Sequence, residues 1–397
     1  MNRKFVYLLA LAHLSNDITI GVLPAILPFF VSQYGMDYSA VAGLMFASCF
    51  LSSVVQPAFG WLADRESRTW YMSLGVLLSG AAMGMSGLFQ SYWAIFTVIT
   101  LSGIGSAIFH PEAARMVNAI AGNKRGMALS IFSVGGNSGF AIGPVMAVAL
   151  ITIFGKKGTV ALCFVALVMA VILMILVPKM QAEIAQATVS RNATVAEKPT
   201  EQEQDGKNNW KAFSQLTLLI VFSSIVICGL RSFIPLYWVD VLKLSEAAAG
   251  SALTLLFALG VVTTLIGGLL ADRFGYLKVV QISYALLAPM VAVLSQTTDA
   301  TTGYWLMVPI GFAMFAPFSS VVVLGQIYLA RSIGFASGVT LGLSFSVGGI
   351  LVPLLGWFAD SHGLTVTMEL LTVIAVAAAL SSFFLPKPEL KPKLEIG

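Results

Sequence analysis

The chain has 397 residues, of which 58% are hydrophobic and only 10% are Asp, Glu, Lys or Arg. Soluble domains carry about 25% charged residues, so this chain has too few charges to build a water-facing surface over its length. The net charge is only +4, and the basic residues are scattered, which excludes a nucleic-acid-binding surface. The composition predicts an integral membrane protein.

A membrane-spanning helix needs about 20 apolar residues. Segments of this kind are predicted at residues 5–31, 40–63, 70–89, 92–117, 126–154, 157–178, 214–239, 248–271, 276–295, 302–330, 335–357 and 364–385. Arg3 and Lys4 before the first segment also resemble the start of a signal peptide. Because hydrophobicity continues to Val31, a retained first helix is favoured.

Residues 179–213 differ from the rest of the chain because they are polar, rich in charge and without an apolar period. Such a segment cannot bury enough surface to fold alone. We therefore expect an N-terminal six-helix bundle at 1–178, a cytoplasmic polar linker at 179–213, and a C-terminal six-helix bundle with a short cytoplasmic tail at 214–397. The predicted fold class is an all-α integral membrane protein with twelve transmembrane helices in two pseudo-symmetric bundles.

The distribution of Lys and Arg predicts the orientation. With twelve helices, eighteen of the 22 basic residues fall on the side of the termini, and Lys156, Lys157 and Lys243 fall on the other. The remaining one, Arg231, lies within the membrane. Cytoplasmic loops carry the excess of Lys and Arg, so both termini are expected in the cytoplasm.

The two halves repeat each other. Residues 60–65 (GWLADR) match residues 268–273 (GLLADR) at five of six positions, and residues 132–136 (FSVGG) recur at 345–349. Each match falls at the equivalent helix of its half. Parallel repeats joined by a linker suit alternating access, in which two rigid halves rock around a site between them.

The segment 60–68 resembles the cytoplasmic loop signature of the major facilitator superfamily, and the whole chain agrees with its six-plus-six plan. Narrower matches lie at residues 13–17 (HLSND), 109–112 (FHPE) and 135–137 (GGN), and these resemble the fosmidomycin-resistance branch. The resemblance implies a proton-coupled drug exporter of the bacterial-type inner membrane with a central cavity. The chain departs from the signature at Glu66 and Ser67, and at Tyr276.

Ionisable groups inside a membrane cost about 2.5–3.5 kcal/mol each and are functional candidates by default. Asp17 lies twelve residues after Phe5, about 18 Å along a helix, and His13 precedes it by one turn on the same face. With Asn16 beside them, the functional interpretation is a proton-titrating carboxylate that lines a cavity. The structural alternative is a polar cluster that joins helix 1 to its neighbours.

His110 and Glu112 are the next candidates for proton coupling, because histidine titrates near neutral pH. On an intact helix the two point in opposite directions unless Pro111 breaks the turn. Glu112 is also three residues before Arg115, which is good spacing for a local ion pair.

Arg231 has no acidic neighbour in sequence, and its fork of donors suits a carboxylate or phosphonate. Direct pairing with Asp17 is disfavoured because the estimated depths differ. Glu369 is expected to be another buried acid. Further candidates for substrate binding are Asn16, Asn137, Tyr237 and Gln326.

Charged residues at the cytoplasmic mouths are expected to act in gating, because an aspartate there can bind a free helix N-terminus. They are Asp64, Arg65, Arg68, Arg115, Asp272 and Arg273. Glycines of the fifth and eleventh helices, among them Gly135, Gly136, Gly139, Gly143 and Gly348, are expected to permit close helix contacts.

Three functions remain open from the sequence. A proton-coupled antiporter that exports a small solute or drug, with a phosphonate-type antibiotic as one candidate, is favoured over an uptake symporter for a small organic anion. A polytopic membrane enzyme is disfavoured because the chain has no nucleotide-binding loop and no HExxH motif. The expected partners are a small-molecule substrate, protons and lipid, with a monomeric protein, no cofactor and no metal. Cys49, Cys163 and Cys228 are interpreted as small hydrophobic residues.

Overall fold

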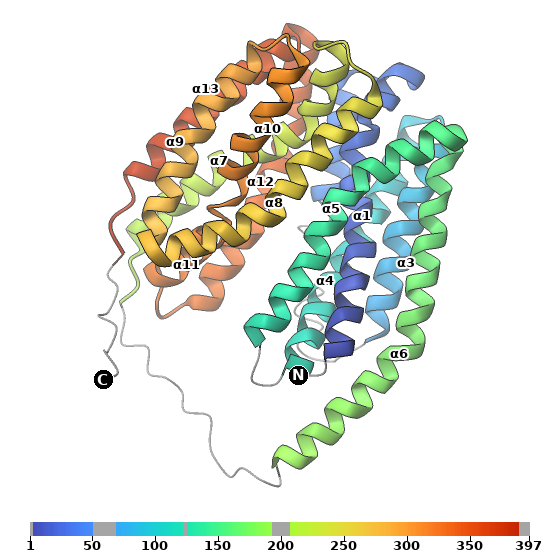
Figure 1. The fold of residues 1–397 in the computed structure, drawn as a ribbon, viewed down its shortest axis with the longest axis vertical. Coiled ribbons are helices and arrows are strands. Elements are labelled where there is room, and N and C mark those ends of the chain that lie inside the picture. Colours follow the sequence, from blue (N-terminus) through green and yellow to red (C-terminus); the bar gives the residue numbers. More distant parts are fainter. Residues whose placement is uncertain (1–2, 51–68, 122–124, 193–206, 389–397) are drawn as a thin grey trace. The chain divides into compact units, whose positions relative to one another are not determined.

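The computed structural model describes residues 3–50, 69–121, 125–192 and 207–388, and Figure 1 shows that they form helices. In chain order these are α1 (Arg3–Tyr34), the helix Tyr38–Phe50, α3 (Trp70–Met85), α4 (Tyr92–Ala121), α5 (Arg125–Phe154), α6 (Ala161–Asn192), α7 (Trp210–Asp240), α8 (Glu246–Phe274), α9 (Tyr276–Ser295), α10 (Ala300–Phe315), α11 (Phe318–Tyr328), α12 (Ile333–His362) and α13 (Leu364–Phe383). The described residues contain one isolated β-bridge, Asn208 with Leu329, and no strand. The predicted all-α class is confirmed.

Nine helical stretches of the described residues are long and apolar enough to cross a membrane. One of them, Met127–Ala182, has 56 residues. At 1.5 Å per residue it would measure about 84 Å, more than twice a hydrocarbon core of about 30 Å. The short 3₁₀ helix η2 (Gly155–Val160), where Gly155 has a φ of 63°, separates this stretch into α5 and α6. The number of twelve spans stays a prediction.

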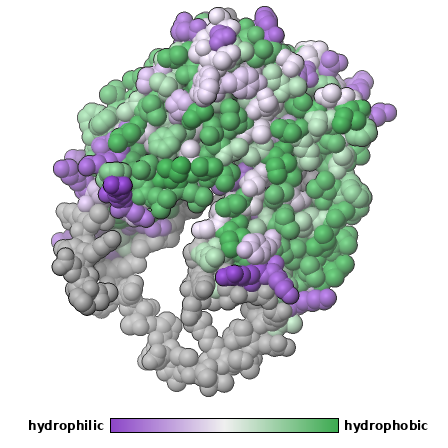
Figure 2. Space-filling view, viewed as in Figure 1, coloured by the Kyte–Doolittle hydropathy of each residue, from purple (hydrophilic) through white to green (hydrophobic). Residues whose placement is uncertain are grey.

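Large apolar side chains on the surface agree with a lipid environment. Phe164 of α6, Leu269 of α8 and Trp305 of α10 are 68%, 71% and 72% exposed. Figure 2 shows hydrophobic residues over most of the described surface in view, with hydrophilic residues toward its upper and lower edges. Apolar surface in water is unfavourable by about 25 cal/mol per Å². These side chains are accordingly lipid-facing, and the chain is a multi-pass membrane protein.

Two predicted helix boundaries differ from the structure. The segment 302–330, predicted as one helix, is divided into α10 and α11 at Pro317, which has no N–H to continue the helical ladder. At this break a side chain on Gly267 of α8 would collide with the carbonyl of Ala316. The sixth helix, predicted to end at 178, continues to Asn192 as α6, because helix propensity can extend a helix beyond its apolar part.

The contacts within the chain group it into two compact units. The first comprises Met1–Thr200, Arg231–Ala258 and Ile350–Leu364, and the second comprises Glu201–Leu230, Leu259–Gly349 and Thr365–Gly397. The first unit therefore contains the N-terminal helices together with the C-terminal parts of α7 and α12 and the first part of α8. The predicted division at a linker of residues 179–213 stays a prediction.

In the first unit α1 and α5 pack closely through glycines. Gly135, Gly139 and Gly143 recur at intervals of four on α5, so they share one face. A side chain on any of them would collide with a backbone carbonyl of α1. On α1, a side chain on Gly21 would lie 2.7 Å from the carbonyl oxygen of Phe140. The expected close contact is confirmed for α5, as small residues permit in membrane proteins.

Two aspartates bind the free N–H groups at the start of the helix Tyr38–Phe50. Asp37 accepts a hydrogen bond of 2.7 Å from the N–H three residues later. Asp360, near the end of α12, accepts bonds from the N–H of Tyr38 at 2.7 Å and of Ser39 at 2.9 Å. A helix leaves its first N–H groups unpaired and favours negative charge there. Asp360 therefore caps this helix across a sequence separation of more than 300 residues.

The same tyrosine also contacts α7. The hydroxyl of Tyr38 donates a hydrogen bond of 2.7 Å to Asp240, the last residue of α7. We call Tyr38, Asp240 and Asp360 the Tyr38 clasp. It joins the first residues of one helix to the C-terminal ends of α7 and α12, all within the first unit.

In the second unit α12 packs against α7 at Gly348. Its N–H donates a bond of 2.9 Å to the hydroxyl of Ser224, and a side chain at this glycine would collide with the Ser224 carbonyl. This glycine therefore has the close-contact role predicted for the eleventh helix. Gln281 of α9 donates a bond of 3.2 Å to the carbonyl of Ser382 on α13.

Candidate functional site

Three titratable side chains meet inside the first unit. His13 and Asp17 lie one turn apart on α1, and His110 comes from α4. The Nε2 atom of His13 lies 3.2 Å from Asp17 Oδ2, and that of His110 lies 3.3 Å from Asp17 Oδ1. The pair of His13 and Asp17 predicted from the sequence is confirmed. We call these three residues the His–Asp–His cluster.

The other ring nitrogens of both histidines face backbone carbonyls. His13 Nδ1 lies 2.8 Å from the carbonyl oxygen of Phe132 on α5, and His110 Nδ1 lies 2.8 Å from that of Ser106. A carbonyl only accepts, so each Nδ1 must carry a hydrogen and donate it. This assignment leaves a lone pair on each Nε2 in the neutral rings.

These two Nε2 atoms are 3.2 Å apart, and both face the Asp17 carboxylate. Three acceptors cannot face one another at hydrogen-bond distance without a hydrogen between them. The geometry therefore leaves room between them for a cation, either a proton or a metal ion. The cluster is a buried place where two ring nitrogens and one carboxylate lie within hydrogen-bond distance of one another.

Aromatic packing and a glycine fix the cluster in position. The ring of Phe132 stacks on that of His13 with 4.0 Å between centroids. A side chain at Gly136 of α5 would lie 2.5 Å from His13 Nε2 and 2.8 Å from Asp17 Oδ2. Both distances are shorter than any real contact of such a carbon, so a side chain at this position would displace the cluster. Gly136 is required here for space.

Asn16 holds the carboxylate rather than facing away from it. Its Nδ2 donates bonds of 2.9 Å to Asp17 Oδ1 and 3.0 Å to the hydroxyl of Ser106. The side chain is fully buried, and its Oδ1 has no partner among the described residues. The structure thus brings Asn16, predicted as a substrate-binding residue, into the shell that orients Asp17. Ser106 was missed, although it lies one turn before His110.

The same three side chains have the composition of a metal site. Their candidate ligand atoms all lie within 4.8 Å of one another. Among the described residues, this is the only such group of three His, Cys, Asp or Glu side chains. Two imidazoles and one carboxylate suit Zn²⁺ or Fe²⁺, and a backbone carbonyl on each Nδ1 is a common support for a metal-bound histidine.

Glu112 is separate from the cluster. Helix α4 continues through Pro111, so Glu112 and His110 point to different sides. Glu112 forms an ion pair with Arg115, with Nη2 to Oε1 at 2.6 Å and Nε to Oε2 at 3.1 Å. The local pair predicted from the spacing is confirmed.

Arg231 of α7 lies against two neighbouring aromatic rings. Its guanidinium carbon is 5.1 Å from the centroid of Phe140 and 5.5 Å from that of Phe257. The residue is only 5% exposed, and its Nε and Nη2 have no hydrogen-bond partner among the described residues. Cation–π contact offsets part of the burial. Leaving a buried donor unpaired costs about 1–3 kcal/mol, and more when the group is charged.

The other predicted site residues are dispersed. Tyr237 of α7 is fully buried, Asn137 of α5 is half-buried, and Gln326 lies on α11 in the second unit. Glu369 is exposed on α13 and accepts a bond of 2.6 Å from Gln296, so its expected burial is wrong. The helical period turns this side chain away from the helix's packed face.

Of the residues predicted to act in gating, Asp272 and Arg273 are exposed on α8. Asp272 Oδ1 accepts a bond of 3.3 Å from the hydroxyl of Tyr276, and Arg273 lies over the ring of Phe274. Asp64, Arg65 and Arg68 lie outside the described residues.

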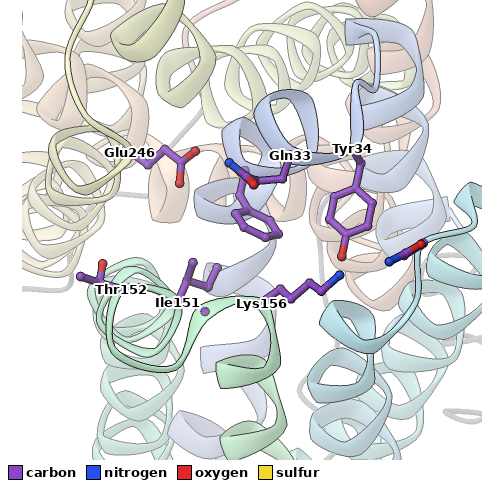
Figure 3. A pocket seen from close by; sticks show the side chains of 9 residues that line it. Gln33, Tyr34, Ile151, Thr152, Lys156 and Glu246 are labelled. Atoms are coloured by element: carbon purple, nitrogen blue, oxygen red, sulfur yellow. The ribbon is translucent and has the colours of Figure 1, made fainter.

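A separate pocket of about 720 Å³ lies at the C-terminal end of α1 (Figure 3). Gln33, Tyr34, Lys156 and Glu246 line it, with the Lys156 ammonium 5.7 Å from the centroid of the Tyr34 ring. Gln33 is sixteen residues after Asp17 on the same helix, about 24 Å along the helix. The pocket is therefore distinct from the His–Asp–His cluster.

Similarity to known proteins agrees with this architecture. The chain is 31% identical to the MFS-type transporter YfnC of Bacillus subtilis (strain 168), over 96% of this chain and 92% of the relative. It is 28% identical to the fosmidomycin resistance protein of Escherichia coli (strain K12), over 94% and 91%.

Solved structures share the fold. A bacterial homolog of the human lysosomal transporter Spinster, in an inward-facing and occupied conformation, matches with a TM-score of 0.79 at 18% identity, over 96% of each chain. The nucleoside transporter NupG matches with a TM-score of 0.71 at 15% identity, over 96% of this chain and 99% of that one. The sequence profile described as Major Facilitator Superfamily matches residues 9–353. The chain therefore belongs to the Major Facilitator Superfamily.

Proposed function

We propose that the protein is a proton-coupled antiporter that exports a small solute by alternating access. The observation that carries this proposal is the convergence of two Nε2 atoms and one carboxylate within 3.3 Å. Such a cluster holds a proton without a permanent positive partner. It can therefore gain or lose that proton as access changes, which is what coupling to a proton gradient requires.

His110 is the entry point of the proton in this proposal. Its side chain is 24% exposed, against 11% for His13 and 4% for Asp17. A proton that arrives from outside binds Nε2 of His110 and is then shared with His13 and Asp17. In the state open to the cytoplasm the cluster releases the proton. Substrate binds in that state and leaves when the cluster is protonated again.

Export is favoured by the names of two relatives. One is the fosmidomycin resistance protein, at 28% identity over nearly the whole chain. The other is the multidrug resistance protein MdtG of Escherichia coli, 32% identical over 136 residues, a third of this chain. We extend efflux, and a phosphonate-type antibiotic as one class of substrate, from these proteins to this chain.

An uptake symporter for a small organic anion is the second candidate, and Arg231 favours it. An anion beside this guanidinium would lie in the same unit as the His–Asp–His cluster, and helix α5 contacts both, through Phe140 and Gly136. Opposite charges attract, so the anion and the proton would strengthen each other's binding. Joint binding is a requirement of symport, whereas exchange requires competition.

We propose that charged residues at the cytoplasmic side set the balance between the two access states. They are Asp64, Arg65, Arg68, Arg115, Asp272 and Arg273. We also propose that both termini are cytoplasmic, from the distribution of basic residues, and that the membrane is the bacterial inner membrane. Bacterial relatives from the same superfamily support this setting.

The test is transport in proteoliposomes with fosmidomycin as the probe. An inside-acid gradient should drive fosmidomycin into the vesicles, because outward proton flow is exchanged for inward substrate. Accumulation only under an inside-alkaline gradient would replace antiport by the symport candidate. Equal flux under both gradients, with counterflow still present, would remove proton coupling.

A further inference from the structure

We propose that Arg231 binds the oxyanion head group, a carboxylate or phosphonate, of the transported solute. This inference rests on the proposed function as a transporter and names the substrate class. It holds for either direction of transport, because both candidates require a solute to bind inside the membrane.

The free edge of the guanidinium has the geometry for this ligand. Nε and Nη2 are the two donors that point the same way from an arginine, and these are the two atoms without a partner. Side by side they match the two oxygens of one carboxylate or phosphonate. Phe140 and Phe257 lie at 5.1 Å and 5.5 Å from the guanidinium carbon and restrict how the plane can turn.

Asp17, the buried carboxylate of the same unit, already has partners. Both oxygens of Asp17 are used, Oδ1 by Asn16 and His110 and Oδ2 by His13. Ion pairs within the described residues join His13, His110 and Arg115 to carboxylates, and none of them includes Arg231. The guanidinium is 5% exposed and has two unpaired donors. It therefore needs an anion, and the described residues do not supply one.

Helix α5 connects this guanidinium to the cluster. Gly136 adjoins His13 and Asp17, and Phe140, four residues later on the same face, contacts Arg231. Four residues correspond to about 6 Å along the helix. Gly136 and Phe140 are thus about one turn apart, so a single helix contacts both the cluster and the guanidinium.

The experiment compares ligands that share a ring and differ in charge: benzoate, phenylphosphonate, benzyl alcohol and benzylammonium. Purified wild-type protein should gain thermal stability with the two anions and not with the alcohol or the cation. Arg231→Met should abolish the gain. Arg231→Lys, which keeps the charge but not the fork, should reduce it. Lys278→Met, which removes an exposed cation, should leave it unchanged.

The Tm without ligand gives an independent readout. Arg231→Met should have a Tm equal to or above that of the wild type, because it removes a buried charge that has no hydrogen-bond partner on two of its nitrogens. A structural arginine would give a clearly lower Tm. A lower Tm with the anion effect retained, or a wild type that does not prefer anions over the alcohol, would overturn the inference.

The two proposals fail separately. If the inference alone is wrong, gradient-driven fosmidomycin transport persists in Arg231→Met at the wild-type rate. If proton coupling alone is wrong, the anions still stabilise the wild type through Arg231, while fosmidomycin flux is the same with and without a proton gradient.

Discussion

Asp17 and Arg231 are buried charges of the same compact unit, and they differ in how they are satisfied. The carboxylate receives bonds from Asn16 and meets two histidine rings at 3.2 Å and 3.3 Å. Among the described residues the guanidinium contacts two aromatic rings, and two of its nitrogens have no hydrogen-bond partner. A carboxylate that the protein's own side chains surround can hold a proton, whereas a guanidinium without hydrogen-bond partners needs an anionic ligand. The difference separates the proposed proton site from the proposed substrate site.

The largest expected effect is that of Asp17→Asn. The amide keeps the size of the side chain but cannot take part in sharing a proton as a carboxylate does. We expect loss of gradient-driven fosmidomycin transport, while counterflow exchange and anion binding at Arg231 survive in part. Glu369→Gln, which changes an exposed acid in the same way, is the control. Unchanged proton coupling in Asp17→Asn would remove this residue from the mechanism.

Gly136→Ala should come next. The added carbon would lie 2.5 Å from His13 Nε2, so the ring must move and the cluster must separate. Overpacking costs about 1–3 kcal/mol, so we expect a lower Tm together with severely reduced transport. Gly338→Ala is the matched control, because no atom lies within 4 Å of a side chain placed there. Equal transport by the two variants would show that the cluster's geometry is not needed.

Single changes of the cluster histidines should have intermediate effects. We expect His13→Gln and His110→Gln each to reduce proton-driven transport, because one ring still shares the proton with Asp17. The double variant should lose coupling, and the two effects should not add. His362→Gln, at the third and exposed histidine, is the control. Additive losses in fluorescence-monitored proton flux would indicate two independent groups.

The Tyr38 clasp supplies a smaller effect, because its acids bind groups at helix ends. Asp360→Asn removes the charge that caps the helix Tyr38–Phe50. We expect faster hydrogen exchange at residues 38 and 39, since helix ends prefer negative charge by about 0.3–1 kcal/mol. Ser32→Ala, which removes the exposed bond to Glu246, should not change that exchange. Unchanged protection in Asp360→Asn would mean that Asp37 caps the helix alone.

The smallest effect should come from Asp299, an exposed acid at the start of α10. The N–H of Thr302 donates to it at 2.7 Å and holds the pKa of this carboxyl below its usual value. A lowered folded pKa means that the stabilisation is complete above the unfolded pKa and is lost as the pH falls through the folded one. We expect Asp299→Ala to lower Tm slightly at neutral pH and not at strongly acidic pH. A pH-independent difference would contradict the cap.

The amino-acid pattern was sufficient wherever the physical cause is local. Membrane helices follow from apolar runs of about 20 residues. The pairs His13 with Asp17 and Glu112 with Arg115 follow from helical spacing. The segment 302–330 corresponds to the apolar stretch Ala300–Tyr328, but its break at Pro317 was not predicted, although proline is a local signal.

Only the tertiary structure decided which distant residues meet. His110 reaches Asp17 because α4 packs beside α1, and the ring assignments depend on carbonyls of α4 and α5. Arg231 contacts the rings of Phe140 and Phe257, which lie on two other helices. Helical period fixes the side of its own helix that each residue occupies. It does not fix which helix lies opposite, because that depends on how all the helices pack together.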